Sequence, residues 1–496
     1  MSYAAAIRLV KSLSKIEKRQ FSLGTRKHQG EKDYMDLFQI IDAHPAHELD
    51  TIRDAFQHSH PKASLENTAR YLVKILSDVL IQSKLKDDTA FKLQYGLLRI
   101  QLLNERSLPE EGYKELKRLQ PLAIQSQNYP IQYMLYRQEL NYVSDHNFKD
   151  LSEKTVIDTQ LKARNVLKDM RNIQEHYSLY ELLKFRLVRS GKVLSEEGRK
   201  QLNDLVLSEM GLVTGRIRHN FESQKLHLLF QSVFFTDIGD YKSAKKTFHV
   251  LNRHFEQHTS LWSYPPLDYF SSLNGILDSL RAIGQTEEIP FYLTKLIQLD
   301  NPSYPEYFCY LVRKTILIYQ LFASIREGNP KEAIERINKT KSGFFDAYSS
   351  VHGEQQDELL FYAGLSFFII ENYRKAFHYI RQVITKRRAD HTSILFKAAR
   401  LLGILIHYED GNLEYLDYEI RSYKRTYTGN VKLLKTEKLI FKTISLHPDL
   451  NGEQKNRLLW KKITPLIGVI EKDKYENQLH KYFNFTQWVK EKFNKP

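Results

Sequence analysis

The sequence predicts an all-α protein, an α-solenoid of about seven or eight stacked helical hairpins with helical caps. Three observations support this fold class. Glycine and proline are scarce, at 20 and 14 of 496 residues, whereas all-β folds need many turns that are rich in both. A short turn phrase recurs at a nearly fixed period. Apolar residues flank that phrase at the spacing of one helix face.

The turn phrase is clearest at residues 239–244, which read GDYKSA. Similar phrases follow at intervals of 40 to 45 residues: GQTEEI at 284–289, GNPKEA at 328–333, ENYRKA at 371–376 and GNLEYL at 411–416. Weaker matches precede it: GKVLSE at 191–196, HNFKDL at 146–151 and SLPEEG at 107–112. In each phrase a glycine or asparagine can end one amphipathic helix before the next begins. A lone hairpin cannot bury both of its faces, so we expect the hairpins to stack.

One repeat unit, FYAGLSFFIIENYRKAFHYI at 361–380, resembles a tetratricopeptide repeat (TPR). The small residue of that family, twelve positions before the turn alanine, is Gly364 before Ala376, and the aromatic three positions before is Tyr373. The resemblance implies a right-handed TPR-like array over residues 86–430 that binds a protein or peptide partner. The family period is about 34 residues, so the helices or linkers must be longer here.

In TPR proteins the first helix of each hairpin lines the concave face. The resemblance places groove positions on two such helices: Glu358, Phe361, Leu365, Phe368 and Ile369 on one, and Ala398, Leu401, Leu405, Tyr408 and Glu409 on the next. These positions are mostly apolar. Such a groove is either closed upon itself or covers an apolar peptide or helix, and both alternatives stay open.

The first 85 residues lack the turn phrase and predict an N-terminal helical cap. We expect four or five short helices, at about 3–13, 15–24, 31–43, 48–59 and 64–84. Ser14 and Glu17 have the spacing of a capping box, so a helix should begin there. The phrase LVKSLSKIEKRQF also resembles the start of uncharacterised repeat proteins from the Bacteroidetes, which implies a family but no activity.

The chain is basic, with a net charge of +15, which suits contact with anionic surfaces. Its first thirty residues contain seven lysines and arginines and a single acid, Glu17. Six of these basic residues are candidate phosphate contacts: Lys11, Lys15, Lys18, Arg19, Arg26 and Lys27. They form either the solvated face of a cap or a helix-turn-helix element that binds nucleic acid.

Residues 431–496 predict a C-terminal helical cap with helices at about 431–446, 452–470 and 475–493. Five aromatic residues gather near its end: Tyr482, Phe483, Phe485, Trp488 and Phe493. A solenoid needs a terminal cap over its last apolar face, and these residues can provide it. The alternative is that they form a patch to which a partner docks.

The sequence contains no signature of catalysis, of a metal site or of a cofactor. The phosphate-loop, dinucleotide, zinc-protease and nucleophile-elbow motifs are all missing. His47 precedes a predicted helix that spans about 16 Å, and His58 and His60 follow it, so the three cannot share one metal ion. Cys309 lies in the apolar phrase YFCYLV and should be a buried thiol.

We also expect a soluble cytoplasmic protein without membrane insertion. One cysteine excludes a disulfide framework within the chain, and no secretory signal or apolar run of 18 residues is visible. The sequence therefore predicts a non-enzymatic scaffold for a protein or peptide partner. The alternative is a regulator whose basic N-terminal region binds nucleic acid while the repeat array senses a partner.

Overall fold

The structure is a computed structural model, and every regular element in its described residues is a helix. The all-α prediction is therefore confirmed. The described residues are 3–24, 33–44, 48–149, 151–214, 220–341, 343–347, 353–386, 393–427, 433–448 and 451–494.

The five helices predicted for the N-terminal region are all present, with bounds within three residues of those expected. They are α1 (Tyr3–Ser12), α2 (Lys15–Gly24), α3 (Asp33–Ala43), α4 (Leu49–Ser59) and α5 (Leu65–Asp87). The capping box is also confirmed: the Ser14 backbone N donates to Glu17 Oε2 at 2.8 Å, and the Glu17 backbone N donates to Ser14 Oγ at 3.2 Å. These helices enclose a core of their own, in which Leu37 and Phe56 are fully buried.

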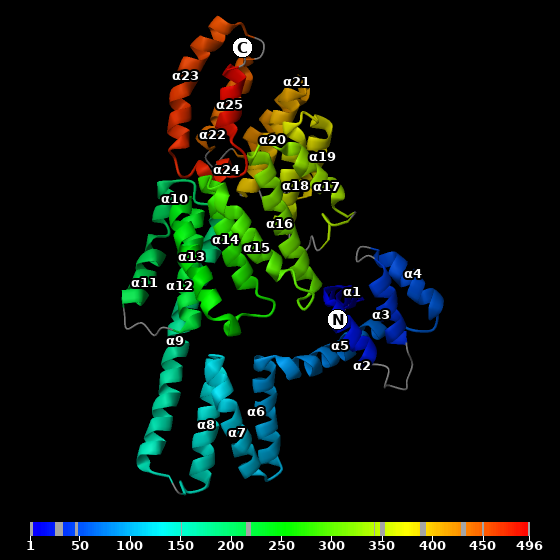
Figure 1. Ribbon diagram of the computed structural model, residues 1–496, viewed down its shortest axis with the longest axis vertical. Coiled ribbons are helices and arrows are strands. Elements are labelled where there is room, and N and C mark those ends of the chain that lie inside the picture. The colour runs from blue at the N-terminus through cyan, green and yellow to red at the C-terminus, as the bar shows by residue number, and fades with distance from the viewer. Residues whose placement is uncertain are drawn as a thin grey trace.

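A helical projection follows the N-terminal region and stands away from the rest of the molecule (Figure 1). It consists of α6 (Thr89–Glu105), α7 (Pro109–Gln125), α8 (Tyr129–Asp145) and the first half of α9 (Glu153–Ser190), each packed on the next. Helix α9 is 38 residues long and leads from the projection into the main body. Two shorter helices, α10 (Glu196–Lys200) and α11 (Asn203–Thr214), come next, and α11 packs on α9.

The main body contains successive helical hairpins. Its helices are α12 (Phe221–Asp237), α13 (Tyr241–Gln257), α14 (Leu267–Ile283), α15 (Ile289–Leu299), α16 (Glu306–Arg326), α17 (Pro330–Lys339), α18 (Gly353–Ile369), α19 (Tyr373–Lys386), α20 (Ile394–Glu409) and α21 (Leu413–Thr426), with short 3-10 turns η2 (Thr259–Leu261) and η3 (Thr286–Glu288). Neighbours pack in chain order, and α14, α16, α18 and α20 also pack on one another. We call these four the inner helices. One continuous apolar core runs through this body.

The five strong turn phrases all fall between two helices of a hairpin, as predicted. Each contains a residue in the left-handed region: Gly239, Gly284, Gly328, Glu371 and Gly411, with φ between 62° and 76°. The turn alanines Ala244, Ala333 and Ala376 are fully buried. A Cβ on Gly364 would lie 2.7 Å from Ile380 Cγ1, so the small residue at this position allows α18 and α19 to approach closely.

The C-terminal helices differ from the prediction in one respect. Helices α22 (Lys435–Leu446) and α23 (Glu453–Glu471) lie close to their expected bounds. The single helix expected at 475–493 is instead divided into α24 (Asn477–His480) and α25 (Phe485–Asn494). Asn484 begins the second helix, because its Oδ1 accepts a hydrogen bond from the Gln487 backbone N at 3.1 Å.

The C-terminal region packs closely against Gly239, which lies in one of the repeat turns. A Cβ at this position would sit 2.3 Å from the backbone oxygen of Lys474, and φ is 75°. We expect Gly239→Ala to lower the free energy of unfolding by about 2 kcal/mol, because left-handed strain and a backbone clash add together. The measurement is urea unfolding followed by circular dichroism.

Gly411→Ala is the matched control for this substitution. Its φ is 73°, but nothing lies within 4 Å of the added Cβ, so only the backbone strain of about 1 kcal/mol should appear. Equal losses in the two variants would show that the close approach of Lys474 does not restrict the side chain at position 239.

Helix α16 is the one described helix that is long and apolar enough to cross a membrane by length and composition alone. In the most apolar 18-residue window of this helix, 67% of the window is buried inside the protein. Lys314 and Thr315 of this helix are also buried, at 0% and 1% exposure. The helix packs against α15, α17 and α18, which is the environment of a core helix.

Candidate functional site

The inner helices present an apolar face, and the chain itself covers that face. Residues 473–494, which we call the C-terminal segment, lie against α14 and α20 through α24 (Figure 1). Aromatic pairs join the two surfaces: Tyr482 contacts Phe361 with ring centroids 5.8 Å apart. Phe483 likewise contacts Phe368, with ring centroids 6.2 Å apart.

The predicted groove positions are therefore mostly buried. The apolar members are at most 9% exposed, except for Ile369: Phe361, Leu365, Phe368, Ala398, Leu401, Leu405 and Tyr408. Ile369 is 39% exposed. The chain's own C-terminal segment covers these positions, an arrangement that neither alternative for the groove described. Contact of these residues with a separate partner stays a prediction.

The aromatic cluster near the C-terminus is largely buried inside the protein, and α25 packs on α22 and α23. Phe485 is fully buried, and Trp488 and Phe493 are 4% and 8% exposed. Trp488 lies 5.8 Å from Tyr408 between ring centroids and donates its Nε1 hydrogen to Glu409 at 2.7 Å. The two apolar features predicted separately, the groove and the cluster, thus contact each other.

A group of buried charges anchors the C-terminal segment to the inner helices. Lys481 Nζ lies 3.0 Å from Asp278 Oδ2, and Arg281 NH2 lies 2.5 Å from Asp278 Oδ1. Arg281 also pairs with Glu358, a predicted groove residue. The side chains of Arg281 and Lys481 are only 2% and 10% exposed. Two cations and two anions balance in this cluster, as burial of charge requires.

The cluster also determines the protonation states of its members. Burial alone would raise the pKa of Asp278, but the charges of Lys481 and Arg281 hold it well below its usual range. Burial would lower the pKa of Lys481, but Asp278 raises it above the usual value. Asp278, Arg281 and Lys481 therefore stay charged at neutral pH.

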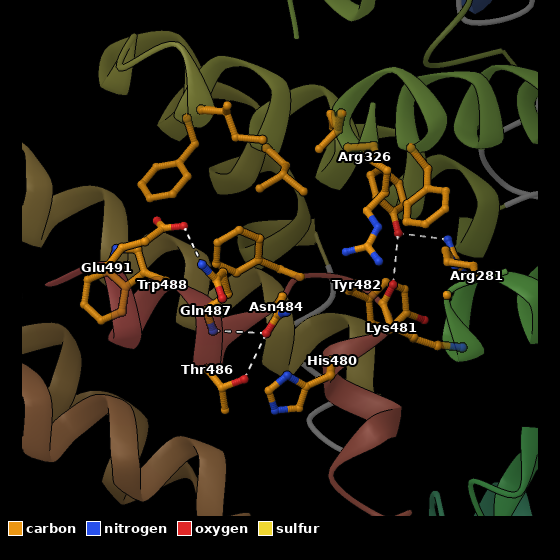
Figure 2. Close-up of a pocket in the computed structure, with 18 of the residues that line it drawn as sticks. Arg281, Arg326, His480, Lys481, Tyr482, Asn484, Thr486, Gln487, Trp488 and Glu491 are labelled. Carbon is orange, nitrogen blue, oxygen red and sulfur yellow. Dashed lines mark hydrogen bonds between the residues drawn. The ribbon is translucent and has the colours of Figure 1, made fainter. Parts of the chain in front are cut away.

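A pocket of about 720 Å³ remains open between the inner helices and the C-terminal segment. Figure 2 shows Arg281, Arg326 and Lys481 at one end of this pocket and Trp488 and Glu491 at the other. Apolar side chains also line it: Leu365, Phe368, Ile369 and Phe483. The exposed Ile369 is thus a predicted groove residue that still faces free space.

The acidic end of the pocket carries carboxylates with different surroundings. Glu409 accepts hydrogen bonds from Trp488 Nε1 and from Lys492 Nζ, the latter at 2.6 Å. Glu491 accepts a hydrogen bond from Gln487 Nε2 at 3.1 Å, as drawn in Figure 2. Elsewhere in the lining, Glu371 and Arg326 are exposed and form no ion pair with another described residue. These side chains are available to a ligand.

His480 lies beside the pocket, with its Nε2 at 2.9 Å from Thr436 Oγ1. Burial lowers its pKa to about 4, against the effect of Glu471, which raises it. Because the unfolded chain has the ordinary pKa of 6.5, it binds a proton first as the pH falls. Stability from this group is complete above pH 6.5 and declines towards pH 4.

We expect His480→Asn to weaken this acid sensitivity. Between pH 7 and pH 5 the histidine should account for a loss of about 2 kcal/mol in the free energy of unfolding. The measurement compares urea unfolding of the wild type and the variant at both pH values. If the two proteins lost stability equally, His480 would not be the group that titrates.

The predicted anion contacts do not form one free patch. Lys18 pairs with Asp42 at 2.7 Å, and Lys11 Nζ donates to the Asp42 backbone oxygen at 3.0 Å. Lys15 and Arg19 are exposed on α2. Arg26 and Lys27 lie outside the described residues. Nucleic-acid contact by this region stays a prediction.

Other polar clusters fit structural roles. His60 lies 3.2 Å from Asp36 and 3.4 Å from Asp33, and His47 is outside the described residues. Within the described part of the chain, no group of three or more histidines, cysteines or acids is placed to hold a metal ion. Cys309 is 4% exposed, and burial raises the pKa of its thiol. A thiol of this kind is a poor nucleophile.

Local sequence patterns did not point to four residues of the site: Asp278, Arg281, Lys481 and Arg326. One signal was present: Asp278 and Arg281 interrupt the apolar phrase NGILDSLRAIG, and charges inside such a run need partners. The partner, Lys481, is 203 positions away and could not be identified from the sequence.

No protein-family model and no curated protein matches the chain.

Proposed function

We propose that this chain is a non-enzymatic interaction protein with a right-handed TPR-like array, and that it binds a segment of a protein partner. The binding site is the pocket between the inner helices and the C-terminal segment. The observation that carries this proposal is the open pocket of about 720 Å³ at the edge of an otherwise covered groove. This volume lies within the range of about 300–1,000 Å³ that is common for ligand sites.

The lining of the pocket supports a peptide-like ligand. Ile369 offers exposed apolar surface, while Arg326 and Glu371 offer charge for orientation. Such a combination of an apolar wall and a few polar groups is typical of specific binding sites. The single buried thiol, Cys309, supports action in a reducing compartment such as the cytoplasm.

The experiment compares two substitutions at neighbouring positions in an affinity pulldown. Ile369→Asp places a charge in the pocket wall, whereas Ile370→Asp changes a residue that does not line the pocket. The two isoleucines are 39% and 37% exposed, so they form a matched pair. The bait is the full chain, the lysate comes from the native source with and without nuclease, and mass spectrometry identifies the captured proteins.

We expect proteins that the wild type and Ile370→Asp capture and that Ile369→Asp loses, regardless of nuclease. If the two variants captured the same proteins, the pocket would not be the binding site. If every captured protein disappeared after nuclease treatment, the regulator with a nucleic-acid-binding N-terminal region would replace the scaffold.

A further inference from the structure

The charged side chains that line the pocket are divided by sign between its two ends. An inference about the ligand follows from this division, and it rests on the proposed function. Arg281, Arg326 and Lys481 lie at one end, and Glu491 lies at the other (Figure 2). Along the C-terminal segment, Lys481 and Tyr482 precede Trp488 and Glu491. Phe483 lies between them along the chain and packs on Phe368 of the inner helices.

Most of these charges are already neutralised by neighbours. Asp278 and Glu358 balance Arg281 and Lys481 at the cationic end. At the acidic end Lys492 pairs with Glu409 at 2.6 Å, and Lys490 pairs with Glu471 at 2.7 Å. A ligand would not have to compensate for any of these paired groups.

Three charged side chains remain for a ligand. Arg326 is the free cation, and Glu371 and Glu491 are carboxylates without an ion pair among the described residues. Arg326 can bind a carboxylate with two parallel hydrogen bonds, which gives both strength and direction. The apolar wall between the two ends needs an apolar side chain as its complement.

We propose that the pocket binds an extended partner segment with an acidic side chain at Arg326, apolar side chains against Phe483 and Ile369, and a basic side chain at Glu491. The order of the acidic and basic side chains follows from the positions of Arg326 and Glu491 at opposite ends of the pocket (Figure 2). Either peptide direction satisfies this order.

Four synthetic peptides test the proposal, each with blocked ends so that terminal charges play no part. All contain a central Leu-Phe pair, flanked by Glu and Lys, by two Glu, by two Lys or by two Gln. Fluorescence anisotropy measures their binding to the full chain. We expect the Glu/Lys peptide to bind about tenfold more tightly than each of the other three, because it alone satisfies both ends.

Charge reversal in the protein should change this preference in a defined direction. Arg326→Glu should make the Lys/Lys peptide the best ligand, and Glu491→Lys should favour the Glu/Glu peptide. Arg374→Glu is the control, because Arg374 is an exposed arginine on α19 that does not line the pocket. It should leave the order of affinities unchanged.

The outcomes separate this inference from the proposed function. Equal binding of all four peptides, no binding by any of them, or a preference that Arg326→Glu leaves unchanged would overturn the polarity. The pulldown with Ile369→Asp would still decide whether the pocket binds a partner. If Ile369→Asp also captured every partner of the wild type, both proposals would fall.

Discussion

Replacing Lys481 with methionine should lower the free energy of unfolding by about 3 kcal/mol. The substitution keeps most of the apolar stem but leaves Asp278 and Glu358 with only Arg281 as a cation. Breaking a buried ion pair costs about 3–5 kcal/mol because the remaining charge stays desolvated. The lower end of that range applies, since Asp278 is 16% exposed. Urea unfolding at pH 7 measures the loss.

Two further variants test the reason for that loss. Lys490→Met removes a cation from a pair whose side chains are 34% and 44% exposed, so it should cost at most about 1 kcal/mol. The double variant Lys481→Met, Asp278→Asn restores the balance of charge and should be more stable than Lys481→Met alone. If the double variant were instead the less stable of the two, charge balance would not be the cause.

Lys481→Met should also have a local effect that hydrogen exchange can detect. Lys481 joins the C-terminal segment to α14, so its loss should favour local opening of this segment. We expect the amides of α24 and α25 to exchange faster in Lys481→Met than in Lys490→Met. Exchange in α1 to α5, which have their own core, should stay the same in both variants.

Lys397→Met should have a larger effect, about 3–5 kcal/mol, because its ion pair is fully buried. The side chains of Lys397 and Glu437 are 1% and 0% exposed, with Lys397 Nζ at 3.3 Å from Glu437 Oε1. The carboxylate also accepts hydrogen bonds from the Tyr423 hydroxyl and the Leu434 backbone N. Without Lys397, the Glu437 carboxylate would keep these neutral hydrogen-bond donors but lose its cationic partner.

The control for this pair is Lys435→Met. Lys435 pairs with Asp473 at 2.7 Å, but its side chain is 53% exposed, so we expect a loss of at most about 1 kcal/mol. The double variant Lys397→Met, Glu437→Gln removes both charges and should recover part of the stability, as measured by urea unfolding. Similar losses from Lys397→Met and Lys435→Met would contradict a special role for burial.

Local sequence signals predicted the helices and turns of this protein well. Each of the five strong turn phrases contains a residue with positive φ, and Gly239 and Gly411 meet a backbone requirement that few other residues satisfy. The capping box of Ser14 and Glu17 is equally local. Such signals depend on neighbours within a few positions, so a single sequence is enough to predict these helix ends and turns.

The candidate site depends on contacts that no local signal encodes. The sequence showed that the face around Phe361 and Leu405 is apolar, but not what covers it. It also missed the division of the last predicted helix, where Lys481 turns towards Asp278. The sequence showed these charges, but their pairing depends on tertiary structure.

The long separation between Asp278 and Lys481 affects the protein during its synthesis. The two residues are 203 positions apart, which corresponds to about 10–40 s of translation at typical rates. Throughout that interval α14 has no Lys481, and the apolar inner face has no C-terminal segment to cover it. A second contact forms equally late: the Gln478 side chain donates hydrogen bonds to the backbone oxygens of Val193 and Asp237. A nascent chain therefore exposes apolar surface, which favours aggregation, until residues 473–494 have left the ribosome.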